Sequence, residues 1–188
     1  MSGFSNIVFN SSTKPTIGVE VELQTLDSKT LAPIAGAPLL LKQYGETTWL
    51  KKELLDSIIE VNTDICNDVS QVRDDLGKKI TDVIKTSNSL DMDILSMGIH
   101  PLMNWKDASI ANDNRYKSFL ERMQWVIKNF IITGLHVHVG VDSGEKAIAV
   151  TNGLTRYIPH LIAISACSAI HDGEVTGLAS TRTKIFEA

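Results

Sequence analysis

An alternating segment near the amino terminus, Thr16 to Gln24, constrains the fold more than any other part of the sequence. Its apolar residues come at every second position, and a glycine or a polar residue follows each one. This period of two predicts a half-buried β-strand. On such a strand Glu20 and Glu22 project from the same face, with their Cα atoms roughly 6.5–7 Å apart.

Two carboxylates at this spacing repel each other, and each disfavours ionisation of the other. A Mg²⁺ or Mn²⁺ ion, which prefers oxygen ligands, would relieve that repulsion. The alternative is that Glu20 and Glu22 form the solvated polar face of an edge strand. The segment taken alone leaves both interpretations open.

A second acidic pair, Glu53 and Glu60, lies in the apolar segment from Lys51 to Thr63. A separation of seven residues would put the two carboxylates on opposite faces of an unbroken strand. A helix would align them two turns apart, and a break at Asp56-Ser57 would let both face one site. We favour two short extended segments, because the second half is rich in β-branched residues.

The segment from Gly134 to Val141 predicts another strand, with apolar residues on one face and His136, His138 and Gly140 on the other. A His-x-His pair on one face of a strand is typical of a metal site, although hydrogen-bonded core histidines are the alternative. Gly140 has no side chain, so a ligand or another backbone segment could approach the strand there.

The remaining patterns predict strands that alternate with helices. The helices are expected to end near Tyr44, to run from Asn67 or Asp68 to about Ser89, to run from about Tyr116 to Thr133, and to cover 145–157 and 161–170. A buried strand is expected from Ile94 to His100, where Pro101 ends it and places His100 at a strand end.

The composition is that of one globular domain. The 188 residues are 43% hydrophobic and 21% charged, and the net charge of −4 with no basic stripe argues against a nucleic-acid partner. Two cysteines and no secretory signal indicate a reduced, cytoplasmic protein. The longest apolar run, 161–170, is too short to span a membrane. Residues 1–14 are expected to be a flexible segment, and 15–188 a folded domain.

Five blocks in order carry a resemblance to a known family. They are G-V-E-V-E, K-x-E-L-L-x-x-x-x-E-V-N-T, G-x-H-P, G-L-H-V-H-V-G and D-G-x-x-T-G-L-A-S-x-R-T. In this order they resemble the glutamate–cysteine ligase type 2 family, also described as YbdK-like carboxylate–amine ligases. One departure is Val21, where many members carry a third acidic residue. Because members are roughly twice as long, 15–188 resembles the amino-terminal half of their catalytic domain.

The resemblance implies an α+β fold like that of glutamine synthetase, in which a curved, mostly antiparallel sheet lines a funnel and helices cover its outer face. It also implies a set of site residues. Glu22, Glu53 and Glu60 would hold one Mg²⁺ or Mn²⁺ ion, and Glu20 and His136 would share a second. Arg182 would be the catalytic cation that neutralises phosphate or a substrate carboxylate. His138 would face nucleotide phosphate or substrate, and His100, Thr176 and Ser180 would line the substrate end.

The activity implied is an ATP-dependent ligation in which the γ-carboxylate of glutamate is joined to an amine, such as cysteine in glutathione biosynthesis, through an acyl phosphate. Two alternatives stay open: a metal-dependent hydrolase, and an inactive truncated or remnant domain with a structural or interaction role. The expected partners are the small-molecule substrates and further copies of the chain, because an open sheet edge and an uncovered apolar face favour association.

Overall fold

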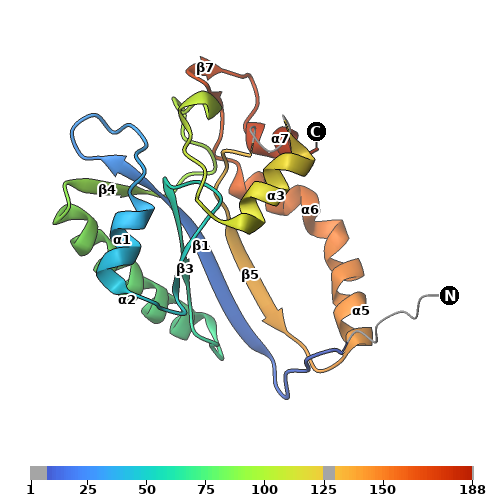
Figure 1. The fold of residues 1–188 in the computed structure, drawn as a ribbon. Helices are drawn as coiled ribbons and strands as arrows, with labels where there is room; N and C mark the ends of the chain where they lie inside the picture. The colour runs from blue at the N-terminus through green and yellow to red at the C-terminus, as the bar shows by residue number, and fades with distance from the viewer. Residues whose placement is uncertain (1–7, 125–129, 188) are drawn as a thin grey trace.

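The computed structural model describes residues 8–124 and 130–187, which form an α+β fold around an antiparallel sheet (Figure 1). Its strands are β1 (Thr16–Asp27), β2 (Leu50–Lys52), β3 (Ile58–Asn62), β4 (Met92–Leu95) and β5 (Leu135–Gly140). The strand order is β2-β3-β1-β4, and β5 also pairs with β1. The predicted α+β class and antiparallel sheet are confirmed.

The predicted alternating segment is the central strand. β1 pairs with β3 over Glu20–Gln24, with β5 over Thr16–Val21 and with β4 over Gln24–Asp27. Since Glu20 and Val21 pair with both β3 and β5, these two strands lie on opposite edges of β1. β1 therefore brings together segments that are more than a hundred residues apart in the sequence.

Helices α1 (Ala37–Tyr44) and α2 (Val69–Asn88) pack on one face of the sheet, as the family resemblance implies. The alternation decides which face, because the apolar residues of one face of β1 and β3 join those of the helices in the main core, namely Val21, Leu23, Ile59, Val61, Leu40 and Val83. Asp68 caps α2 by accepting a hydrogen bond from the Gln71 N–H. The opposite face of the sheet is left to the polar residues of β1 and β3.

The carboxyl-terminal part of the chain is more open. It contains the 3₁₀ turn η1 (Trp105–Asp107), α3 (Asn114–Met123), α5 (Gly144–Leu154), η2 (Thr155–Tyr157), α6 (Ile158–Ser165), a hairpin of β6 (Ile170–His171) and β7 (Glu174–Val175), and α7 (Thr181–Glu187). In Figure 1, α5 and α6 form an arm beyond β5, and no residue of either helix is buried. Among the described residues, no helix has both the length and the apolar character needed to cross a membrane.

Three predicted boundaries are wrong. The strand expected from Ile94 to His100 is β4, which ends at Leu95. Beyond Leu95, Gly134 replaces β4 along the edge of β1, because the Glu22 N–H donates to the Gly134 carbonyl. The helix over 161–170 ends at Ser165, and the Ser168 N–H instead donates to the Ala179 carbonyl.

The helix expected from Tyr116 to Thr133 is α3, which ends at Met123. Gln124 adopts a positive φ of 48°, which no α-helix continues through. Residues 125–129 of the expected helix lie outside the described residues. Ile131, further on, is not helical and is buried in a separate apolar cluster with Leu55 of the β2–β3 turn. The flexible segment expected over residues 1–14 falls partly outside the described residues; from residue 8 onward it has no helix or strand before β1.

Candidate metal centre

The register of the sheet places two rows of polar side chains on the face opposite α1 and α2. In the first row, Glu22 of β1 lies directly across from Glu60 of β3, which lies across from Lys51 of β2. In the second row, Glu20 lies between Asn62 of β3 and His136 of β5. The period of two puts both rows on one face, so the pairing of distant strands assembles the site.

Glu53 joins the first row because the chain breaks after β2. Residues Asp56 and Ser57 form a turn, as the sequence predicts, and Ala37 and Thr25 donate backbone hydrogen bonds to their carbonyls. Because of this break, the side chains of Glu53 and Glu60 reach the same site, although an unbroken strand would place them on opposite faces. As a result, Glu22, Glu53 and Glu60 each offer an oxygen within 4.8 Å of the others.

The three-carboxylate group carries strong like-charge repulsion. Burial, and then the charges of Glu22 and Glu60, raise the pKa of Glu53 to about 7. Burial also raises the pKa of Glu22, although the Gly134 N–H, which donates to Glu22 Oε2 at 2.7 Å, partly offsets this effect. Glu53 therefore gives up its proton less readily than an ordinary glutamate does.

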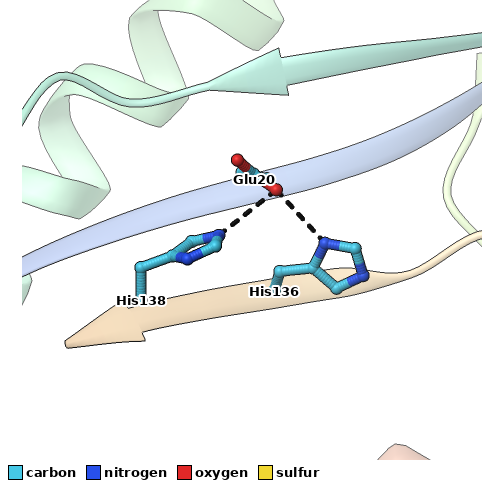
Figure 2. A group of neighbouring side chains, drawn as sticks. All are labelled: Glu20, His136 and His138. Carbon is cyan, nitrogen blue, oxygen red and sulfur yellow. Dashed lines mark hydrogen bonds and ion pairs between the residues drawn. The ribbon is translucent and has the colours of Figure 1, made fainter. Parts of the chain in front are cut away.

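The second group consists of Glu20, His136 and His138 (Figure 2). Glu20 Oε2 lies 3.2 Å from His136 Nδ1 and 3.2 Å from His138 Nε2, so one carboxylate oxygen of β1 contacts both imidazoles of β5. A carboxylate only accepts, so these two nitrogens carry the hydrogens. Burial raises the pKa of Glu20, but the hydrogen bonds from the two histidines outweigh it and the pKa lies below its ordinary value.

Arg182, in the first turn of α7, lines two neighbouring cavities, and Glu22 also lines both of them. One of about 270 Å³ is lined by Glu53, His136 and a group of aromatic residues, and the other of about 280 Å³ by Gly98, Thr133 and Cys167. The Arg182 Nε–H donates to the Thr133 carbonyl at 3.0 Å, and its guanidinium lies 5.5 Å from the centroid of the Phe186 ring. The predicted cation is therefore held next to the predicted carboxylates.

The other three predicted residues lie elsewhere. His100 is buried in a separate, mainly apolar cavity of about 820 Å³, where its Nε2 contacts the Leu31 carbonyl and its Nδ1 accepts from the Leu102 N–H. Thr176 bonds to Thr181, and Ser180 bonds to Thr183. Within the part of the chain that the structure describes, none of the three lines the two cavities at Glu22, and their substrate roles remain predictions.

Sequence reasoning missed two features of the site. His138 lies as close to Glu20 as His136 does, whereas the resemblance implied that it faces nucleotide or substrate instead. Asn62 Nδ2 donates to Glu60 Oε1 at 2.7 Å. The second contact had a visible signal, because Asn62 follows Glu60 by two residues on a predicted strand and so shares its face.

The space beside Gly140, where the sequence predicts close approach by a ligand or another segment, is occupied by the side chains of Thr16 and Ser12.

The donor atoms of the two groups fit divalent ions. Three carboxylates supply only oxygen, which suits Mg²⁺ or Mn²⁺, and the imidazole–carboxylate group suits a softer ion such as Mn²⁺ or Zn²⁺. Imidazole nitrogens and carboxylates must lose their protons to bind an ion, so occupancy of either group would depend on pH.

Comparison with known proteins identifies the family. A sequence profile described as Glutamate-cysteine ligase family 2 (GCS2) matches residues 16–188. The chain belongs to glutamate–cysteine ligase family 2. It is 40% identical over 185 residues to a Gloeobacter violaceus protein that carries the provisional name glutamate–cysteine ligase 2, and 37% identical over 188 residues to one from Thermobifida fusca with the same provisional name.

The match to these family members is partial on their side. It covers 96% and 97% of this chain but 50% and 47% of the two relatives, so the chain spans about half the length of the curated relatives it matches. Two solved structures share the fold. A glutamate–cysteine ligase from Francisella tularensis in complex with AMP aligns with a TM-score of 0.53 and 16% identity over 78% of this chain and 30% of that one.

The second is a bifunctional glutathione synthetase from Pasteurella multocida, which aligns with a TM-score of 0.51 and 12% identity over 77% of this chain and 19% of that one. At these identities the two structures support the fold of the family member described here and nothing more specific.

Proposed function

We propose that this chain carries the metal-binding face of an ATP-dependent carboxylate–amine ligase that forms a γ-glutamyl amide bond. The observation that carries the proposal is the convergence of six potential ligand side chains, in two adjacent groups, on one face of the sheet. Family membership supports the ligase class, and the pair of groups supports a reaction that handles several phosphate charges at once.

In the proposed reaction a γ-carboxylate oxygen of glutamate attacks the γ-phosphorus of ATP, the bond to the β-phosphate oxygen breaks, and ADP leaves. The amine nitrogen then attacks the acyl carbon of the acyl phosphate, the carbon–oxygen bond breaks, phosphate leaves, and the nitrogen loses a proton. Little covalent chemistry is required of the protein, so positioning and neutralisation of charge dominate catalysis.

The residues of the chain would divide this work. Glu22, Glu53 and Glu60 would hold one ion, and Glu20 with His136 and His138 would hold a second. When bound, Mg²⁺ or Mn²⁺ supplies positive charge that binds and orients phosphate oxygens. Arg182, which is fixed through Thr133 and Phe186, would bind phosphate or the substrate carboxylate.

The hydrolase alternative has one observation in its favour. Two histidines and one glutamate around a single point form a donor set that is also used in catalytic Zn²⁺ sites. The neighbouring group of three carboxylates has no place in a single-zinc hydrolase, and it favours the ligase.

The test uses the 188-residue chain alone and joined to the carboxyl-terminal half of the Gloeobacter violaceus relative. Each protein is incubated with Mg²⁺ or Mn²⁺, ATP, glutamate and a panel of amines, and ADP and γ-glutamyl amides are measured by mass spectrometry. Formation of ADP and amide in equal amounts by the joined protein, lost in Glu22→Gln, is the expected result. Hydrolytic activity with Zn²⁺ and no amide product would overturn the proposal.

A further inference from the structure

Asn62 occupies a position that asparagine rarely takes. Asparagine is depleted in strands, yet Asn62 ends β3, an interior strand of the sheet, and is 8% exposed. Its main chain is held without help from the side chain, since its N–H donates to the Trp49 carbonyl at 2.7 Å and its carbonyl accepts from Lys79 Nζ at 3.1 Å. The side chain is therefore available for another role.

That side chain fixes one oxygen of Glu60. Asn62 Nδ2 donates to Glu60 Oε1 at 2.7 Å, and Lys51 Nζ lies 3.4 Å from the same oxygen. Because a carboxylate only accepts, the orientation of the amide is determined by chemistry. Two donors on Oε1 restrict the rotation of the carboxylate and leave Oε2 as the oxygen that neither Asn62 nor Lys51 binds.

Asn62 also stands between the two candidate ion groups. It is the register partner of Glu20 and shares its strand face with Glu60, so it touches one group and neighbours the other. An aspartate here would have nearly the same shape, but it would add a carboxylate to a face that already carries Glu20, Glu22, Glu53 and Glu60. Asparagine supplies a donor without adding charge.

We propose that Asn62 is a positioning residue of the metal centre: together with Lys51 it binds Glu60 Oε1 and so presents Oε2 to the ion shared with Glu22 and Glu53. The inference rests on the proposed function, because it assumes that this group holds a divalent ion. Outer hydrogen bonds of this kind typically contribute about 10–100-fold to metal affinity.

The experiment measures Mn²⁺ binding to the purified 188-residue chain by calorimetry and by electron paramagnetic resonance. Glu60→Gln identifies the binding event that belongs to the carboxylate group. Asn62→Ala, which removes the donor, should weaken that event by about tenfold or more. Asn62→Asp, which replaces the donor with a charged acceptor, should weaken it further. The combination of Asn62→Ala with Lys51→Met should be non-additive, because both residues bind the same oxygen.

Ser87→Ala is the matched control for stability. Ser87 is fully buried in α2 on the helical side of the sheet, where its hydroxyl donates to the Val83 carbonyl, so its loss should lower the melting temperature without changing Mn²⁺ affinity. Circular dichroism confirms that each variant is folded at the temperature of the titration.

Unchanged Mn²⁺ affinity in folded Asn62→Ala and Asn62→Asp would overturn the inference and leave the proposed function standing. Failure of the wild-type chain to bind Mn²⁺ at all would overturn both. Wild-type binding that weakens in the Asn62 variants, with no amide formed by the joined protein, would support the inference and overturn the proposed ligase activity.

Discussion

Glu22 combines an unfavourable electrostatic environment with a position at the candidate metal centre. It is half-buried and lies near two other carboxylates, and the hydrogen bond that it accepts from the Gly134 N–H partly offsets the resulting rise in its pKa. Charge repulsion of this kind lowers the stability of a protein unless a bound cation offsets it. The arrangement is expected at a binding site and has no evident structural purpose.

Replacement of Glu22 by glutamine should therefore separate binding from stability. Glutamine keeps the shape of the side chain and removes its charge, so Mn²⁺ affinity should fall by about tenfold or more while the metal-free protein becomes no less stable. Calorimetric titration and thermal unfolding measure the two effects. Glu145→Gln, an exposed position in the first turn of α5, is the control and should change neither. A large loss of stability in Glu22→Gln with unchanged affinity would contradict the assignment.

Glu53 should make metal binding depend on pH. Its pKa is raised to about 7, so below pH 7 an ion must displace a proton, and Mn²⁺ affinity should rise with pH by up to about tenfold per unit before levelling above pH 7. Titrations at pH 5.5 and 7.5 measure the difference, which Glu53→Gln should largely remove.

The same shift gives a stability prediction with a definite sign. Because the pKa of Glu53 is higher in the folded state than the ordinary value of 4.5, its contribution favours folding at low pH and is lost as the pH rises through about 7. The metal-free protein should accordingly melt at a higher temperature near pH 5.5 than near pH 7.5, once the contribution of other groups is removed by comparison with Glu53→Gln. An identical pH profile in the two proteins would contradict the prediction.

At the scale of elements, the ladder between β1 and β5 holds Glu20, His136 and His138 together. It aligns Glu20 with His136 and Gly18 with His138, and it ends where Thr16 pairs with Gly140. The space at Gly140 is already filled, because a Cβ atom there would collide with the Thr16 hydroxyl and lie 2.6 Å from Ser12 Oγ. The absence of a side chain serves this close approach of two segments of the chain.

Gly140→Ala should push the end of β5 away from β1. Overpacking of this kind costs about 1–3 kcal/mol, which should appear as a lower melting temperature. Gly153→Ala is the matched control, since no atom lies within 4 Å of a Cβ at that position in α5, and a helical alanine should stabilise the protein by up to about 1 kcal/mol. Equal effects from the two substitutions would show that the contact at Gly140 is not tight.

At the scale of the whole molecule, the apolar face of β5 is uncovered by the described residues. Leu135, Val137 and Val139 of β5 are 62%, 54% and 60% exposed, although the equivalent face of β1 and β3 is covered by α1 and α2. Among the described residues, β5 pairs with β1 alone, so its other edge has unpaired backbone groups. An open edge next to an apolar face favours association with another polypeptide.

We therefore expect the 188-residue chain to self-associate through β5. Sedimentation velocity at several protein concentrations should show a concentration-dependent shift that Val137→Lys reduces, because a charge on this face opposes its burial. Ile65→Lys is the control, since Ile65 is also apolar and 81% exposed but lies before α2, on a different part of the chain. A monomer at all concentrations would contradict the prediction.

The sequence by itself determined the strands β1 and β5 and the face on which their polar residues lie. Alternation predicts β1 and β5. The odd spacing of Glu53 and Glu60, together with the β-branched residues around Glu60, favours two extended segments with a break at Asp56-Ser57 over a helix, and Asn67 or Asp68 is the predicted cap of α2. These features depend on neighbours within a few residues, so periodicity and capping suffice to predict them. The motifs also indicated the family, although the roles of the site residues stay predictions.

Only the tertiary structure decided which of these faces meet. The pairing of β1 with both β3 and β5 placed His138 beside Glu20 and Asn62 beside Glu60, and the packing of α7 placed Arg182 next to Glu22. The Glu22–Gly134 contact lies where β4 ends, earlier than the local pattern predicts, and His100 lies in a separate cavity. Register and packing join residues that are tens to more than a hundred positions apart, and no local pattern encodes those distances.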